Sequence, residues 1–198
     1  MDHDVVLSVV ASCETERKLL AIPAAILETA WKREAQIEAV IDAVLHTAFV
    51  EDPKGYVHAR HVGEWCARIA ADLPCGPNPS LSRRVGVLKD IDPAVLERLP
   101  ETSGFACCVR EFQESCFLKS PGERTTTTIL AAVADEFVSC TRPDSNGFCF
   151  SPRRALEIMR AGATASNAVA IAALERAVTH GGDIDECGRG KRWLDGTA

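Results

Sequence analysis

The chain has 198 residues, of which 25% are charged and 46% hydrophobic, and its formal net charge is -6. This length fits one domain with a small extension, and the acidic balance argues against nucleic acid or anionic lipid as a partner. No apolar stretch reaches the length of a membrane span, and Asp2 and Asp4 stand where a signal peptide would be basic. We therefore expect a cytoplasmic protein without membrane insertion.

Helical periodicity dominates the first third of the chain. Residues 14–31 are predicted to be helical, with a kink or break at Pro23. Residues 37–48 follow with apolar side chains on one face of a helix. Residues 52–55, Asp-Pro-Lys-Gly, predict a turn, and a further helix then carries the inward-facing positions of residues 62–73.

The middle of the chain is predicted to alternate loops with short helices. Residues 74–80 contain three prolines and a glycine, which indicates a loop. A short helix is expected over residues 81–89, and Asp92-Pro93 is suited to restarting the chain as a helix. Residues 100–122 give no clear prediction.

The last third predicts three helices. Residues 125–140 are apolar along one side, residues 152–162 begin at a Ser151 cap and end at Gly162, and residues 166–179 form the last helix. The expected architecture is all-α, with an N-terminal helical extension over residues 1–50, a main helical domain over residues 51–182 and a flexible tail over residues 183–198.

Nine cysteines without a CxxC pair and without a secretory signal argue against a disulfide framework. We expect reduced thiols, most of them acting as small buried hydrophobic side chains. The adjacent pair Cys107-Cys108 lacks zinc-ribbon spacing. A thiol-based sensor is one alternative function, and it would require an exposed cysteine with a lowered pKa.

Three short segments carry the residues most suited to chemistry. They are His58-Ala59-Arg60-His61-Val62, Val87-Leu88-Lys89-Asp90-Ile91-Asp92 and Ile129-Leu130-Ala131-Ala132-Val133-Ala134-Asp135. The third continues through Phe137 and Arg142-Pro143 to Ser151-Pro152. This order resembles the HD superfamily, and its last part is similar to the end of an HD-GYP domain, a family of cyclic di-GMP phosphodiesterases. The resemblance covers residues 58–178 and implies an HD-domain helical bundle from bacterial signal transduction.

The resemblance implies a metal site made of His58, Asp90 and Asp135. In such a bundle, imidazole and carboxylate ligands from several helices converge on divalent metal ions, here iron, manganese or magnesium. The metal ions activate a water molecule and hold a phosphate for in-line attack.

Several departures from the family pattern argue against that activity. Lys89 stands where the histidine of the His-Asp pair is expected, the Gly-Tyr-Pro signature is missing, and no histidine lies between Asp90 and Asp135. A protonated ammonium has no lone pair and cannot bind a metal. Our hypothesis is that Lys89 replaces the metal as a structural cation between two buried carboxylates. Two simpler interpretations are that Asp135 pairs with Arg142 and that Lys89-Asp90 is a solvated helix end.

The leading prediction is a catalytically degenerate HD-GYP-like domain that acts by binding, as a bacterial signalling or regulatory protein. It would bind a protein partner or a nucleotide and need no cofactor. The alternative is a metal-dependent phosphohydrolase of the phosphodiesterase class with a reduced metal site. The apolar face of residues 37–48 also predicts homodimerisation, since it exceeds what one bundle would bury.

Overall fold

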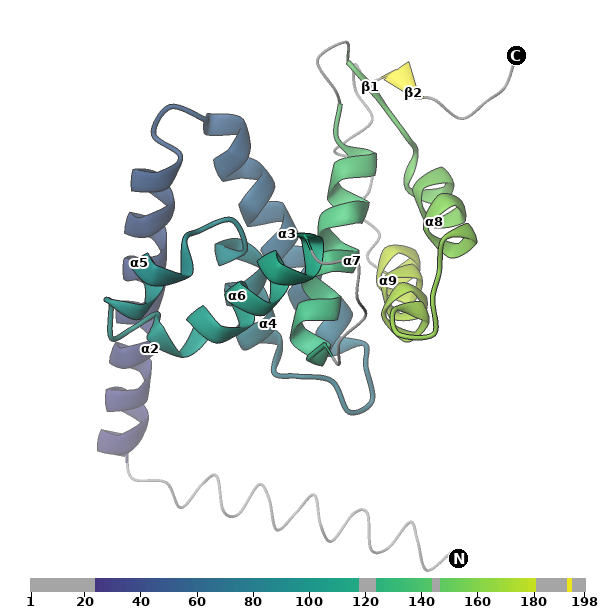
Figure 1. Ribbon diagram of the computed structural model, residues 1–198. Helices are drawn as coiled ribbons and strands as arrows, with labels where there is room; N and C mark the ends of the chain where they lie inside the picture. Colours follow the sequence, from purple (N-terminus) through teal and green to yellow (C-terminus); the bar gives the residue numbers. More distant parts are fainter. Residues whose placement is uncertain (1–23, 118–123, 144–146, 181–191, 194–198) are drawn as a thin grey trace, which may run out of the picture. The chain divides into compact units, whose positions relative to one another are not determined.

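The computed structural model describes residues 24–117, 124–143, 147–180 and 192–193 (Figure 1). The elements in chain order are α2 (Ala24–Ala48), α3 (Pro53–Ala71), α4 (Pro79–Leu88), α5 (Pro93–Glu97), α6 (Ser103–Phe117), α7 (Thr126–Thr141), β1 (Phe148–Cys149), α8 (Pro152–Ala161), α9 (Ala168–His180) and β2 (Arg192–Trp193). The prediction of an all-α chain is confirmed for this described part, apart from two very short strands. No helix within these ranges is both long and apolar enough to cross a membrane. Of the helix predicted over residues 14–31, residues 14–23, including the kink at Pro23, lie outside them, and the rest belongs to α2.

Four helices begin at a polar cap that is followed directly by a proline. The pairs are Asp52-Pro53, Asn78-Pro79, Asp92-Pro93 and Ser151-Pro152. In each pair the cap side chain accepts a backbone N–H of the first turn, and proline tolerates this position because its missing N–H would have no helical partner. The prediction of a turn over residues 52–55 was wrong for this reason. Asp52 Oδ1 accepts the Gly55 N–H at 2.9 Å and caps α3, which begins at Pro53.

The chain divides into two compact units, residues 1–40 and residues 41–198. The described part of the first unit is the N-terminal portion of α2. In it Trp31 is 77% exposed, and Lys32 pairs with Glu28 along the helix. In the second unit, the last part of α2 contributes Ile41 and Leu45 as fully buried side chains.

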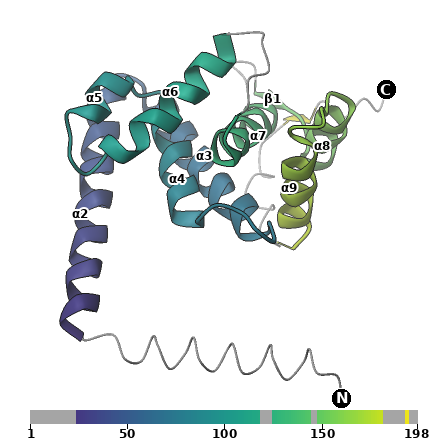
Figure 2. The ribbon, with the colours of Figure 1, turned by 60° about the horizontal axis from the view of Figure 1, so that its bottom comes forward.

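The second unit is organised around α3 and α7. Helix α3 packs against α4, α7 and α9, and α7 also contacts α4, α6, α8 and α9. Figure 2 shows α7 between α3 on one side and α8 on the other. Leu130, Val133, Ala134 and Phe137 form the buried face of α7, so the centre of this helix lies in the hydrophobic core.

Helices α3 and α4 approach each other closely at two glycines. A Cβ atom added to Gly86 would lie 2.5 Å from Cys66 Sγ and 3.2 Å from Gly63 Cα. A Cβ atom added to Gly63 would lie 2.2 Å from Val87 Cγ2. The two glycines therefore let the backbones meet, and this contact sets the position of the C-terminal end of α4, where Lys89 and Asp90 lie.

Helix α6 lies within residues 100–122, for which we had no prediction. Its buried residues Phe105, Ala106, Val109 and Phe112 recur at helical spacing and face the interior. A second unpredicted feature is a parallel pairing of Phe148 and Cys149 with residues 192–193. The remainder of the tail predicted to be flexible, residues 183–191 and 194–198, lies outside the described residues.

Candidate functional site

The three segments singled out in the sequence converge in space. His58 comes from the second turn of α3, Lys89 and Asp90 follow the end of α4, and Asp135 lies in the middle of α7. Asp135 Oδ1 accepts a hydrogen bond from His58 Nε2 at 2.8 Å and lies 2.9 Å from Lys89 Nζ. Lys89 Nζ also donates to Asp90 Oδ2 at 2.6 Å. We call these four residues the Lys89 cluster.

Burial within the Lys89 cluster is uneven. The Lys89 side chain is 4% exposed, whereas Asp90 is 42%, Asp135 31% and His58 22% exposed. The expectation of two buried carboxylates was therefore wrong. The buried member is the ammonium, and the carboxylates lie at the edge, where water still solvates part of their charge.

Helix α6 supplies the rest of the surroundings of Lys89. Lys89 Nζ lies 5.7 Å from the centre of the Phe112 ring, in cation–π geometry. Gln113 Nε2 donates to the carbonyl oxygens of Lys89 and Ile91, at 2.9 and 3.0 Å. These bonds satisfy carbonyl groups just beyond the end of α4 that have no helical partner. The sequence interpretation missed both residues because it did not predict α6, although the apolar spacing of that helix was a usable signal.

The ionisation of the Lys89 cluster follows from these contacts. Burial alone would lower the pKa of Lys89, but the hydrogen bond and charge of Asp90, and then those of Asp135, raise it above its ordinary value. Burial would raise the pKa of Asp135, but His58 and Lys89 lower it overall. Lys89 is therefore protonated and Asp135 ionised at neutral pH.

The buried thiol of Cys66 borders the same charges. Burial raises its pKa most, and the charge of Asp135 acts in the same direction while that of Lys89 opposes it. The thiol is therefore neutral at physiological pH. It acts as a small apolar group against Gly86 rather than as a ligand or nucleophile.

Two simpler interpretations of the sequence are wrong. Arg142 does not pair with Asp135 in the structure, because its guanidinium donates to the Lys54 carbonyl at 3.2 Å. Lys89-Asp90 is not a solvated helix end, because the Lys89 side chain is buried. His61, the second histidine of the first segment, is exposed.

The predicted metal ligands are only partly brought together. His58 and Asp135 touch directly, and Asp90 is joined to Asp135 through the ammonium of Lys89. Within the described ranges, no group of three or more histidine, cysteine, aspartate or glutamate side chains is arranged to hold a metal ion.

The burial of the side chain is described for six of the nine cysteines, and these six are less buried than predicted. Cys66 and Cys149 are buried, Cys108 and Cys140 are partly exposed, and Cys75 and Cys107 are exposed. Burial raises the pKa of Cys108, to about 11, and that of Cys140. These shifts are opposite in sign to what a thiolate-based sensor requires.

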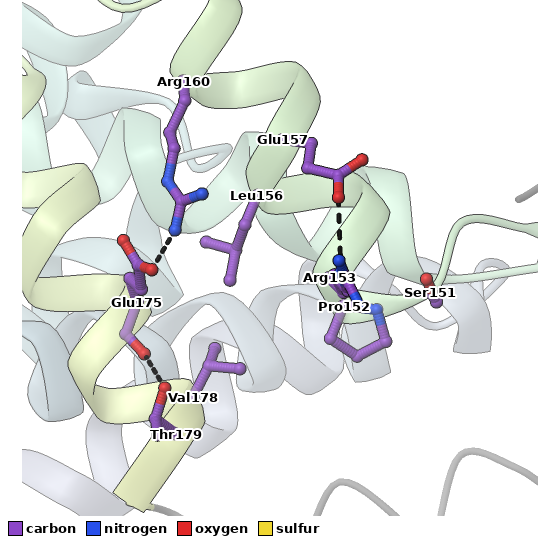
Figure 3. Close-up of a pocket in the computed structure, with 9 residues that line it drawn as sticks. All are labelled: Ser151, Pro152, Arg153, Leu156, Glu157, Arg160, Glu175, Val178 and Thr179. Atoms are coloured by element: carbon purple, nitrogen blue, oxygen red, sulfur yellow. Dashed lines mark hydrogen bonds and ion pairs between the residues drawn. The ribbon is translucent and has the colours of Figure 1, made fainter.

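A pocket of about 620 Å³ lies between α8 and α9 (Figure 3). Leu156 and Val178 point into it, and its rim carries the ion pairs Arg153–Glu157 and Arg160–Glu175. The volume falls in the range of small-molecule sites. The pocket shares no lining residue with the Lys89 cluster, and sequence reasoning did not identify it.

Comparisons with protein-family models, with curated proteins and with solved structures each find no match to this chain.

Proposed function

We propose that this chain is a catalytically degenerate HD-GYP-like domain that acts by binding in bacterial regulation. The observation that carries the proposal is the position of Lys89 Nζ, 2.6 Å from Asp90 and 2.9 Å from Asp135. The family resemblance assigns these carboxylates, with His58, to a metal. In this chain a side-chain cation bridges the two carboxylates instead.

Electrostatics supports this assignment. A divalent metal entering the Lys89 cluster would be repelled by the protonated ammonium, which already lies 2.6 Å from Asp90 and 2.9 Å from Asp135. Removing that repulsion requires Lys89 to lose its proton, but both carboxylates raise its pKa. The residues present therefore do not fit a divalent metal as they are arranged.

The loss of the metal would remove the chemistry that the resemblance implies. Metal-dependent phosphohydrolysis needs an ion to activate water and to hold the phosphate. In its place stand a His58–Asp135 hydrogen bond and two ion pairs, which hold α3, α4 and α7 together. We assign the Lys89 cluster a structural role and place ligand binding elsewhere on the domain.

The pocket between α8 and α9 is the cavity that a small ligand would use under this proposal. Its apolar floor and its rim of paired charges suit an amphipathic molecule, and a nucleotide or a peptide segment of a protein partner both have that character.

The decisive experiment compares the metal content of purified wild type, Lys89→His and Asp135→Ala by inductively coupled plasma mass spectrometry. Lys89→His restores the residue that the family pattern predicts at this position. We expect no stoichiometric metal in the wild type and a gain of iron, manganese or another divalent metal in Lys89→His. Lys54→His, at an exposed lysine of α3, is the matched control and should gain none.

The opposite result would favour the phosphohydrolase alternative. That result is near-stoichiometric metal in the wild type that disappears in Asp135→Ala, together with metal-dependent hydrolysis of bis-p-nitrophenyl phosphate or cyclic di-GMP. Hydrolysis that is unchanged in Asp135→Ala would come from a contaminant.

A further inference from the structure

Helix α6 carries two adjacent thiols on its outer surface. Cys107 is exposed and Cys108 partly exposed, and their sulfur atoms lie 3.9 Å apart. Val109 and Phe112 of the same helix are buried. The two thiols therefore form a dithiol pair on a well-packed helix, and the pair plays no part in the Lys89 cluster or the pocket.

Open space lies beside this pair. Side chains on a helix lean toward its N-terminus, and Cys107 Sγ lies 3.9 Å from the carbonyl oxygen of Gly104 accordingly. A Cβ atom added to Gly104 would meet nothing within 4 Å. An atom bonded to both sulfurs could therefore lie over the Gly104 turn without displacing any part of the described structure.

The raised pKa of the Cys108 thiol selects among thiol-binding ligands. Burial raises the pKa of Cys108 to about 11, and the neighbouring Cys107 and Glu111 add to the rise. Alkylation, disulfide exchange and coordination of soft metal cations all require a thiolate, so at Cys108 they are disfavoured at neutral pH. A ligand that reacts with protonated thiols by losing water does not meet this barrier.

We propose that Cys107 and Cys108 form a chelating site for trivalent arsenic, as neutral arsenous acid or a mono-substituted arsenic oxide. In arsenous acid each thiol replaces one hydroxyl group: an S–H bond and an As–O bond break, an As–S bond and an O–H bond form, and one water molecule leaves for each thiol. In a mono-substituted arsenic oxide the single oxygen takes the protons of both thiols and leaves as one water molecule, while two As–S bonds form. Arsenic stays trivalent throughout, so no oxidant or reductant is needed.

Chelation gives the pair its advantage over a single cysteine. Once one As–S bond has formed, the second thiol is held beside the arsenic atom at a high effective concentration. Loss of either thiol should therefore weaken binding by about a hundredfold, the order expected when a two-point attachment becomes a one-point attachment.

The test uses the full reduced chain and phenylarsine oxide, followed by intact-mass spectrometry. We expect an adduct whose added mass equals the reagent less one water, since the oxide carries one oxygen for two thiols. The adduct should map to the peptide containing residues 107–108. It should be removed by 2,3-dimercaptopropanol and resist β-mercaptoethanol at equal thiol concentration.

Three variants make the result specific. Cys107→Ser and Cys108→Ser should each lose the bridged adduct, whereas Cys75→Ser, at an exposed cysteine outside the pair, should keep it. Thermal unfolding checks that each variant is folded, and Cys107→Ala and Cys108→Ala provide a second set if a serine variant is not. Wild-type affinity in both single variants, or an adduct that maps to other cysteines, would overturn the proposal.

Discussion

The Lys89 cluster and the rim of the α8–α9 pocket are both built from ion pairs, but they differ in burial. The Lys89 side chain is 4% exposed, whereas Arg153 in the pocket rim is 91% exposed and its partner Glu157 is 41% exposed. Water stabilises the separated ions of an exposed pair almost as well as their mutual attraction does, so such pairs contribute little to stability. The burial of the cation, rather than the number of ion pairs, therefore decides which region depends on its charges.

The largest effect that would sharpen this comparison is expected for Lys89→Met. Methionine keeps most of the buried apolar stem but removes the charge, which leaves Asp90 and Asp135 without the cation they share. We expect the free energy of unfolding to fall by about 3 kcal/mol, measured by urea denaturation. Lys32→Met, in a pair whose lysine is 75% exposed, is the matched control and should change stability by less than about 0.5 kcal/mol. Equal effects in the two variants would contradict the structural role of Lys89.

A smaller effect is expected for Gly86→Ala, which tests the helix contact that positions the Lys89 cluster. The added methyl group would meet Cys66 Sγ and the backbone of Gly63, so α3 and α4 would have to separate. We expect a loss of about 1–2 kcal/mol, because overpacking outweighs the better helix propensity of alanine. Both glycine variants are compared with the wild type by urea denaturation. Gly104→Ala, where the added methyl group meets open space, should be neutral or slightly stabilising.

The pH dependence of stability should be weaker still and should have two limbs. The pKa of Asp135 is lowered in the folded state, so its contribution is present above the unfolded value, about 3.9, and is lost as pH falls through the folded pKa. The pKa of Lys89 is raised, so its contribution is present below the unfolded value, about 10.4, and is lost as pH rises through the folded pKa. Asp135→Asn should flatten the acid limb of a denaturation series, and Lys89→Met the alkaline one. If Asp135→Asn loses stability at acid pH as steeply as the wild type, other carboxylates cause that loss.

The smallest effect is expected at the pocket rim. Glu157→Gln removes the charge that Arg153 and Arg154 share at the surface, and the midpoint of urea denaturation should not change measurably, because water screens an exposed pair. A loss comparable to that of Lys89→Met would show that exposure does not separate the two regions.

Local sequence signals predicted much of the fold and the members of the cluster. The apolar spacing of α7 and the Ser151-Pro152 start of α8 are features of neighbouring residues, so they can be read without knowing the fold. The proximity of Lys89 to Asp90 and Asp135 was expected from the family resemblance. The burial of Lys89 rather than of the carboxylates was not expected. It depends on how Phe112 and Gln113 of α6 pack against the end of α4. The pocket escaped prediction because its walls come from two helices whose contact no local pattern encodes.

The two carboxylates around Lys89 have a consequence for how this position could change during evolution. Lysine and histidine codons differ at both the first and the third base, so the direct two-step route between them passes through asparagine or glutamine. Either would place a neutral side chain between Asp90 and Asp135 and remove the cation that both acidic groups contact. On that direct route, a lineage carrying lysine here would pass through a less stable protein before acquiring a histidine. Selection for stability alone would therefore disfavour that route.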